Sequence, residues 1–351
     1  MFSNSIYKRA DSNLPNAAAR SDNQSGYFMH RREFFGLASA AVLATGLPPA
    51  AVHADPRLEP VQNTNPGAPL PAPMELGLKI DLFGAAEERI RLVHDLGFSN
   101  CFFSLDGYIG HFTPSLASQI RDLLDKYQLV ATTVEVVGPP PLVWNFLRGP
   151  STIGLVPPAT RAARIDALRQ VSDFARLMGI NQVQTHCGFI PENPADPLYP
   201  QAVEAIGAVA RHCQKNGQHF LMETGQETPT TMSRMIRDVD LPNLAVGLDT
   251  ANLILYGKAN PSDAVDILGP HIHAIHAKDG LWPTDPDQLG KEVLIGTGRV
   301  NFLEVFTKLH RIGYSGTVSI ERETSGPQQM ADVAREKDFL EITLQKVFAQ
   351  G

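Results

Sequence analysis

Residues 219–225 read HFLMETG, and this short stretch decides the fold class. Its first four residues have the apolar character of a buried strand, but the strand ends on a carboxylate, Glu223, followed by a Thr-Gly pair. In parallel α/β barrels the reacting groups lie at the C-terminal ends of the strands. The stretch therefore predicts a barrel strand that presents a functional Glu223.

The rest of the chain alternates short apolar runs with amphipathic segments. Strands are predicted at residues 76–83, 100–105, 129–137, 182–186, 219–223, 244–249, 272–277 and 317–321. Helices are predicted at residues 85–96, 114–127, 161–178, 201–216, 230–237, 262–268, 302–312 and 328–348. This alternation predicts a parallel sheet, and eight repeats predict closure into a single-domain α/β fold, the (β/α)8 TIM barrel, over residues 74–351. An open doubly wound sheet is the alternative, which the absence of a Gly-rich loop after the first strand disfavours.

Residues 1–54 have the three regions of an export signal. Arg31 and Arg32 precede two Phe residues and an Ala-rich apolar run, a pattern that resembles a twin-arginine signal peptide. The pattern predicts the twin-arginine translocation machinery as a partner during export, cleavage near Ala54, and a periplasmic or secreted mature protein. A disordered N-terminus with a chance arginine pair is the alternative. The apolar run is shorter than the ~20 residues of a membrane span, so no stable membrane anchoring is expected.

The N-terminal part has two further boundaries. Residues 55–73 are Pro-rich and predict an extended linker before the barrel. Residues 1–28 are polar and unpatterned, so the sequence leaves open whether translation starts at Met1 or Met29.

Composition narrows the class of partner. The formal net charge of −7 disfavours general binding to nucleic acid. Only three cysteines are present, at wide spacing, which predicts neither a disulfide framework nor a cysteine-based metal site.

Three further predicted strands carry an acid or a histidine at, or one residue before, their C-terminal end: Asp249, His276 and Glu321. Strand alternation allows all four side chains to point into the barrel lumen. Three carboxylates brought together would repel one another and would be costly to desolvate unless a cation lay between them. We therefore predict one divalent metal ion, with Mn favoured by the oxygen-rich ligands and Mg, Co or Zn as alternatives. Buried salt bridges to barrel arginines are the structural alternative.

Five motifs occur along the chain in a characteristic order: LMETGQE, GLDTANLILYG, HIHAIHAKDG, IGTGRVNF and SIERE. Together they resemble the sugar phosphate isomerase/epimerase superfamily of xylose isomerase-like TIM barrels, over about residues 75–345. The resemblance implies that Glu223, Asp249, His276 and Glu321 bind one divalent ion and that the two glutamates act as the acid/base pair. Many members have a substrate-binding His three residues after the strand-six Asp. Here that position is Asn252, so the usual substrate of the family cannot be assumed.

The predicted site suits removal of a proton next to a carbonyl, because a bound metal stabilises the resulting enediolate. We expect a metal-dependent sugar isomerase or epimerase. Export favours an unphosphorylated sugar, since sugar phosphates are scarce outside the cytoplasm. A lyase or dehydratase acting on a keto-sugar, a cyclitol or a 3-keto-glycoside would use the same site.

Secondary substrate-binding candidates lie near the same strand ends, and each has a structural alternative. His186 ends the fourth predicted strand and would bind a hydroxyl or be a satisfied core histidine. Lys278 would orient a substrate oxygen or belong to a solvated loop. Glu323 would bind sugar hydroxyls or pair with Arg299.

Two loops complete the predicted substrate site. Trp144 and Trp282 follow the third and seventh predicted strands and would stack on a sugar ring or pack within their loops. The loop at residues 138–158 is long for a barrel connection and is expected to shape substrate choice.

The sequence disfavours two other classes of function. A multi-zinc apurinic endonuclease is disfavoured because residues 282–287 supply acids where further histidines would be needed. A non-catalytic sugar-binding protein is disfavoured because all four ligand positions are intact. The expected partner is a small sugar or sugar derivative, and a homo-oligomer is compatible with the sequence.

Overall fold

The computed structural model describes residues 74–349. The predicted signal peptide at 1–54 and the linker at 55–73 lie outside the described residues, so these two predictions and the predicted export are not tested by the structure.

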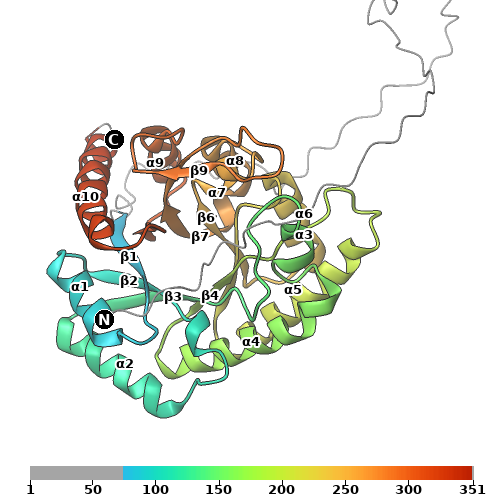
Figure 1. Cartoon of the computed structure of the whole chain (residues 1–351), viewed down its shortest axis with the longest axis horizontal. Coiled ribbons are helices and arrows are strands. Elements are labelled where there is room, and N and C mark those ends of the chain that lie inside the picture. Colours follow the sequence, from blue (N-terminus) through green and yellow to red (C-terminus); the bar gives the residue numbers. More distant parts are fainter. Residues whose placement is uncertain (1–73, 350–351) are drawn as a thin grey trace, which may run out of the picture. The chain divides into compact units, whose positions relative to one another are not determined.

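Eight parallel strands close into a barrel in the order β1-β10-β7-β6-β5-β4-β3-β2 (Figure 1). They are β1 (Glu75–Asp81), β2 (Asn100–Ser104), β3 (Val130–Glu135), β4 (Gln182–Thr185), β5 (His219–Glu223), β6 (Leu244–Asp249), β7 (Ile272–Ala277) and β10 (Thr317–Ile320). The first and last strands pair with each other, which completes the ring and leaves no open edge. The predicted (β/α)8 TIM barrel is confirmed, and the open-sheet alternative is wrong.

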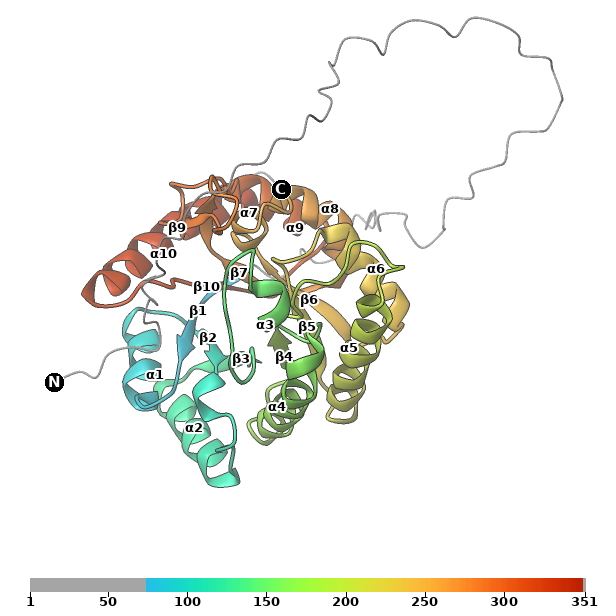
Figure 2. The ribbon, with the colours of Figure 1, turned by 45° about the vertical axis from the view of Figure 1, so that its right-hand side comes forward.

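Helices surround the barrel (Figure 2). They are α1 (Ala86–Asp95), α2 (Pro114–Tyr127), α3 (Gly149–Thr152), α4 (Pro158–Leu177), α5 (Leu198–Lys215), α6 (Pro229–Val239), α7 (Asn252–Leu255), α8 (Pro261–Leu268), α9 (Phe302–Arg311) and α10 (Pro327–Phe348). Within residues 74–349, none of them combines the length and the hydrophobicity that a bilayer crossing requires.

Local sequence accounts for several helix ends. Thr113 precedes α2 and accepts a hydrogen bond from the Leu116 amide at 3.1 Å, and Asn301 caps α9 in the same way at 3.3 Å. Gly179 and Gly313 follow α4 and α9 with φ of 75° and 80°, which only glycine adopts without strain.

Several predicted boundaries shift by one to three residues, and two differences lie next to the site. The third strand ends at Glu135 rather than at residue 137, because the Asp106 carboxylate accepts the Val137 and Gly138 amide hydrogens, both at 2.9 Å. Residues after β7, expected to form a loop, form an antiparallel hairpin of β8 (Asp279–Leu281) and β9 (Lys291–Val293).

The barrel lumen is filled in layers. Leu221, Ala245 and Ala274 form a small buried apolar cluster from three neighbouring strands. Because side chains alternate along a strand, the residues two positions further on share this inward direction. On β5 and β7 those residues are Glu223 and His276, which places these predicted site residues in the lumen above an apolar floor.

One acid organises the loop that follows the hairpin. The Asp279 carboxylate accepts amide hydrogens from Gly280 at 2.8 Å, Gly296 at 3.0 Å, Gly298 at 2.8 Å and Val300 at 3.1 Å. This cluster gives the AKDG and IGTGRV motifs a structural purpose, since the acid of one motif orders the backbone of the other.

We expect Asp279→Ala to lower the free energy of unfolding by about 3 kcal/mol, because four amide groups, two of them in buried hydrogen bonds, would lose a charged acceptor. Urea unfolding followed by circular dichroism measures the change. Asp287→Ala, an exposed acid in the same region, is the control and should change stability by less than about 0.5 kcal/mol. Equal stability of the two variants would contradict the prediction.

Candidate metal and catalytic site

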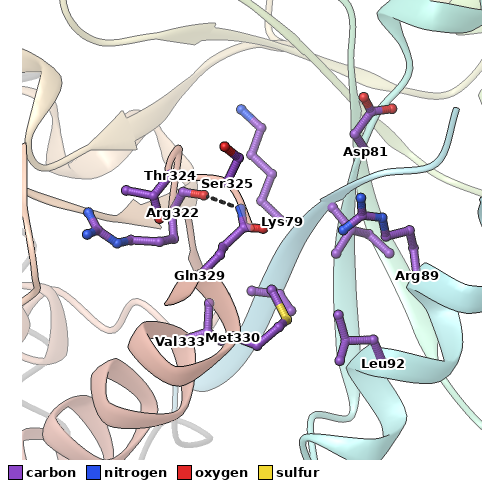
Figure 3. A pocket seen from close by; sticks show the side chains of 12 residues that line it. Lys79, Asp81, Arg89, Leu92, Arg322, Thr324, Ser325, Gln329, Met330 and Val333 are labelled. Atoms are coloured by element: carbon purple, nitrogen blue, oxygen red, sulfur yellow. Dashed lines mark hydrogen bonds between the residues drawn. The ribbon is translucent and has the colours of Figure 1, made fainter. Parts of the chain in front are cut away.

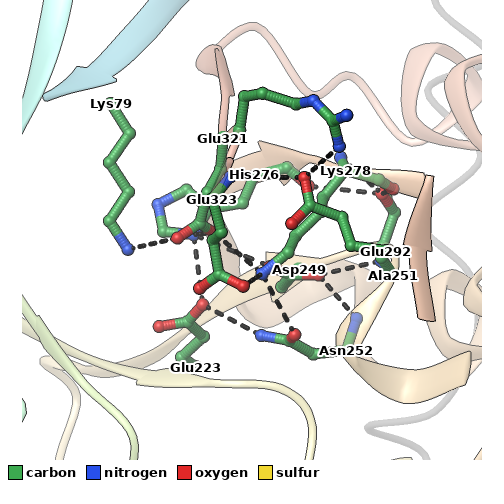
Figure 4. Close-up of polar contacts among 12 residues, drawn as sticks. Lys79, Glu223, Asp249, Ala251, Asn252, His276, Lys278, Glu292, Glu321 and Glu323 are labelled. Atoms are coloured by element: carbon green, nitrogen blue, oxygen red, sulfur yellow. Dashed lines mark hydrogen bonds and ion pairs between the residues drawn. The ribbon is translucent and has the colours of Figure 1, made fainter. Parts of the chain in front are cut away.

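Glu223, Asp249, His276 and Glu321 converge at the C-terminal ends of their strands (Figure 4). All four are buried, and each offers a ligand atom within 4.8 Å of the others. His276 Nδ1 lies 3.1 Å from Glu223 Oε1, 3.0 Å from Glu321 Oε2 and 4.0 Å from Asp249 Oδ2. The convergence expected from four strand ends is thus present in the fold.

These four residues fit a divalent cation. One oxygen of Asp249 accepts the Ala251 and Asn252 amide hydrogens at 2.8 and 2.7 Å, whereas its other oxygen, Oδ2, has no hydrogen-bond partner among the described residues. A buried carboxylate oxygen without a partner is costly, and a metal ion would satisfy it. The donor set of carboxylate oxygens and one imidazole suits a metal of the Mn, Mg, Co or Zn type.

The electrostatics of the cluster also favour a cation. Burial alone would lower the pKa of His276, but the Glu321 and Glu223 carboxylates raise it to about 10. Burial raises the pKa of Asp249 well above its usual range, despite the nearby Lys278. In the absence of a metal, protons therefore supply part of the positive charge that this site needs.

Metal binding should accordingly release protons. Because His276 is protonated up to about pH 10 and must give up a proton to ligate, we expect at least one proton released per ion. The apparent metal affinity should rise about tenfold per pH unit between pH 7 and 9. Calorimetry of Mn²⁺ binding in buffers of different ionisation enthalpy measures the proton count. An affinity that is independent of pH would contradict the assignment of His276 as a ligand.

The predicted secondary residues divide into two groups. His186, Asn252 and Lys278 are buried beside the cluster. His186 Nε2 lies 3.2 Å from Glu223 Oε2, and the Asn252 amide donates to Glu223 Oε1 at 3.3 Å and accepts from Lys278 at 3.5 Å. These three residues therefore contact the four-residue cluster directly or through one another.

The other four residues lie further out. Glu323 pairs with Lys278 at 2.9 Å, and Arg299 is exposed and lies in the loop organised by Asp279, so the predicted Glu323–Arg299 pair is wrong. The reason is that Lys278, buried directly after β7, needs a counterion more than an exposed arginine does. The Trp144 ring packs edge-on against His186 with centroids 4.9 Å apart, whereas Trp282 is 42% exposed.

Two charged residues complete the site without having been predicted to do so. The Lys79 ammonium lies 2.7 Å from Glu321 Oε1 and forms an ion pair with Glu135. Glu135 is expected to be lumenal from its strand position, but the sequence assigns it no role. The signal for Lys79 is a lone lysine between Leu78 and Ile80 in an apolar strand, because an unpaired lysine would not be buried there.

Comparison with known proteins defines the family. Residues 90–342 match the family described as xylose isomerase-like TIM barrel. The chain belongs to this family. A xylose isomerase domain protein from Planctomyces limnophilus has a similar structure, with 30% identity, a TM-score of 0.74, and coverage of 79% of this chain and 99% of that one.

More distant solved structures share the fold. A D-psicose 3-epimerase solved in the presence of D-fructose is 18% identical with a TM-score of 0.59, over 77% of this chain and 99% of its own. The probable 3-DHS dehydratase AsbF from Bacillus anthracis is 16% identical with a TM-score of 0.56, over 76% and 98%. By sequence, the uncharacterized protein MJ1311 of Methanocaldococcus jannaschii is 26% identical over 204 residues, 53% of this chain and 66% of that protein.

Proposed function

We propose that this xylose isomerase-like protein is a divalent-metal-dependent sugar isomerase or epimerase that removes a proton next to a carbonyl. The proposal rests on one observation, which is that three buried carboxylates and one buried imidazole surround a common point. A divalent ion held there would supply positive charge to the oxyanion that develops as the proton leaves. Manganese remains our proposed metal because most of the donor atoms are carboxylate oxygens.

The protein's own residues would move the proton. Glu223 and Glu321 are the two glutamates of the cluster, and each reaches His276 with one oxygen. We propose that one takes the proton from carbon and the other returns it, at the same carbon in an epimerase or at the neighbouring one in an isomerase. His186, Asn252 and Lys278 would position substrate oxygens.

The charge arrangement supports an unphosphorylated substrate. The ammonium of Lys79 is paired with Glu135 and Glu321, and that of Lys278 with Glu323. Cations that already have carboxylate partners are poor anchors for a phosphate, which needs free positive charge or free amide groups. A neutral sugar or keto-sugar is the substrate class that we propose.

A lyase is the second candidate. The fold is shared with a probable dehydratase as well as with epimerases. If the substrate carries a leaving group β to the acidic carbon, proton removal by the same glutamate would lead to elimination instead of reprotonation. Cyclitols that carry a ketone and 3-keto-glycosides have this arrangement.

Metal analysis and solvent exchange test the proposal together. The purified protein, Glu223→Gln and Glu321→Gln are assayed for metal by mass spectrometry and then incubated in D₂O with ketoses, cyclitols and 3-keto-glycosides. Deuterium incorporation that either variant loses supports isomerase or epimerase chemistry, and loss of water or alcohol supports the lyase. Binding of sugars without any exchange or elimination would instead support a sugar-binding protein.

We also propose export through the twin-arginine route, on the basis of the N-terminal sequence alone. Cell fractionation and N-terminal sequencing of the mature protein test this. A mature chain that begins near residue 55 in the periplasm or medium is expected. A full-length cytoplasmic protein would remove the argument from location for an unphosphorylated substrate.

A further inference from the structure

A second potential cation site lies beside the first. Glu135, His186 and Glu223 also present ligand atoms within 4.8 Å of one another, and all three are buried. Glu223 belongs to both groups. Glu135 Oε1 and Glu223 Oε2 have no hydrogen-bond partner among the described residues, although Glu135 is 2% exposed and Glu223 is fully buried. The geometry of this triad is that of a second ion position sharing Glu223 with the first.

A protein cation already contacts one member of this triad. The Lys79 ammonium contacts Glu135 and extends to Glu321, one member of each group. It also faces the ring of Phe102, with 5.5 Å to the centroid, and Phe102 packs on His276 with centroids 4.5 Å apart. Figure 4 shows Lys79 and Lys278 approaching Glu321 from different sides. Lys79 is thus held in place by two carboxylates and an aromatic face.

The buried charges balance with a single divalent ion. Glu135, Glu223, Asp249 and Glu321 carry four negative charges when ionised. Lys79 and Lys278 supply two positive charges, with Lys278 also paired to the exposed Glu323, and one divalent ion supplies the other two. A second divalent ion would leave an excess of two positive charges in a site that water hardly reaches, which is strongly unfavourable.

We propose that Lys79, by pairing with Glu135 and Glu321, supplies the positive charge that a second divalent ion beside Glu135, His186 and Glu223 would otherwise supply, and that it restricts this barrel to one divalent ion per chain. The inference rests on the metal-dependent function proposed above. A lysine does not dissociate, so it keeps Glu135 and Glu321 in fixed positions whatever the metal supply. Lys79 is accordingly a positioning residue for Glu321.

One side of Lys79 borders a cavity. Lys79 lines a cavity of about 210 Å³ between β1, α1 and the start of α10, together with Arg89, Arg322 and Gln329 (Figure 3). Its side chain is 13% exposed. On this side, Lys79 is therefore only partly shielded from solvent.

The test counts bound metal ions in the full protein. Wild type, Lys79→Met and Lys79→Gln are saturated with Mn²⁺, desalted and analysed by mass spectrometry and by electron paramagnetic resonance. We expect one ion in wild type and two in both variants, with the spectrum changing from that of an isolated ion to that of an exchange-coupled pair. Circular dichroism confirms that each variant is folded.

Three further variants serve as controls for the ion count. Lys79→Arg keeps the charge and should bind one ion, and Lys79→Met combined with Glu135→Gln removes a ligand and should return to one. Lys126→Met breaks an exposed ion pair with Glu87 and should also bind one.

The outcomes separate this inference from the proposed function. One ion in both wild type and the Lys79 variants, or two in wild type, would overturn the role of Lys79 and leave the metal-dependent function standing. Absence of bound ions from every protein would instead count against the metal-dependent function itself.

Discussion

Glu223→Gln is expected to lower the rate of deuterium exchange into the substrate by about 10³-fold, within the range typical of a lost general base. Glutamine keeps the size of the side chain and an oxygen toward His276, but it cannot take a proton from carbon. Glu223 is fully buried and contacts His276, Asn252 and His186. The exchange rate at saturating Mn²⁺ is the decisive measurement, since it separates loss of the base from weaker metal binding.

Glu336→Gln is the matched control for that experiment. Glu336 is also a buried glutamate, 1% exposed, but it lies on α10 and accepts the Ile295 amide hydrogen at 3.2 Å. The control should exchange deuterium within about twofold of wild type. If Glu223→Gln retained exchange within tenfold of wild type at full metal occupancy, Glu223 would not be the base, and Glu321 would be the next candidate.

Removal of the metal is expected to lower the melting temperature by about 5–10 °C and to abolish exchange. An ion present at 100 times its dissociation constant stabilises the folded state by about 2.7 kcal/mol. For a barrel of this size, each kcal/mol corresponds to about 2–4 °C in melting temperature. Thermal unfolding with excess chelator, and again after Mn²⁺ is restored, measures the change.

Asp249→Asn tests whether that stabilisation comes from the proposed centre. Asparagine retains an oxygen for the Ala251 and Asn252 amide hydrogens but replaces the metal-facing oxygen with an amide nitrogen. We expect this variant to melt at the same temperature with and without Mn²⁺, close to the value for chelated wild type. A full metal-dependent rise in the variant would contradict a role for Asp249 as a ligand.

Local sequence was sufficient to predict the barrel strands because each is a short apolar run with turn residues on either side. β5, β6 and β7 begin and end where the pattern predicts. β3 ends early because Asp106, about 30 residues earlier in the chain, takes the amide hydrogens that would have continued the strand. A side-chain acceptor from a distant segment leaves no periodic signal in the strand that it shortens.

The four candidate metal-site residues were also predictable from local sequence. Acids and a histidine at strand ends can be recognised in the sequence. In a barrel, the C-terminal ends of all strands lie at the same end of the lumen, so these residues come together. The partners of those residues are not visible in this way. Glu323 pairs with Lys278 instead of Arg299, and only the three-dimensional arrangement brings Lys278 within 2.9 Å.

The closed barrel and the four residues at its mouth could be predicted from the sequence, since periodicity and strand ends are local properties. The tertiary structure alone decided that Lys79 meets Glu135 and Glu321. These residues lie on β1, β3 and the end of β10, far apart in the chain, and ring closure brings β1 beside β10. Coulomb attraction and desolvation depend on distance in space, so the charge balance of the site emerges only when the barrel closes.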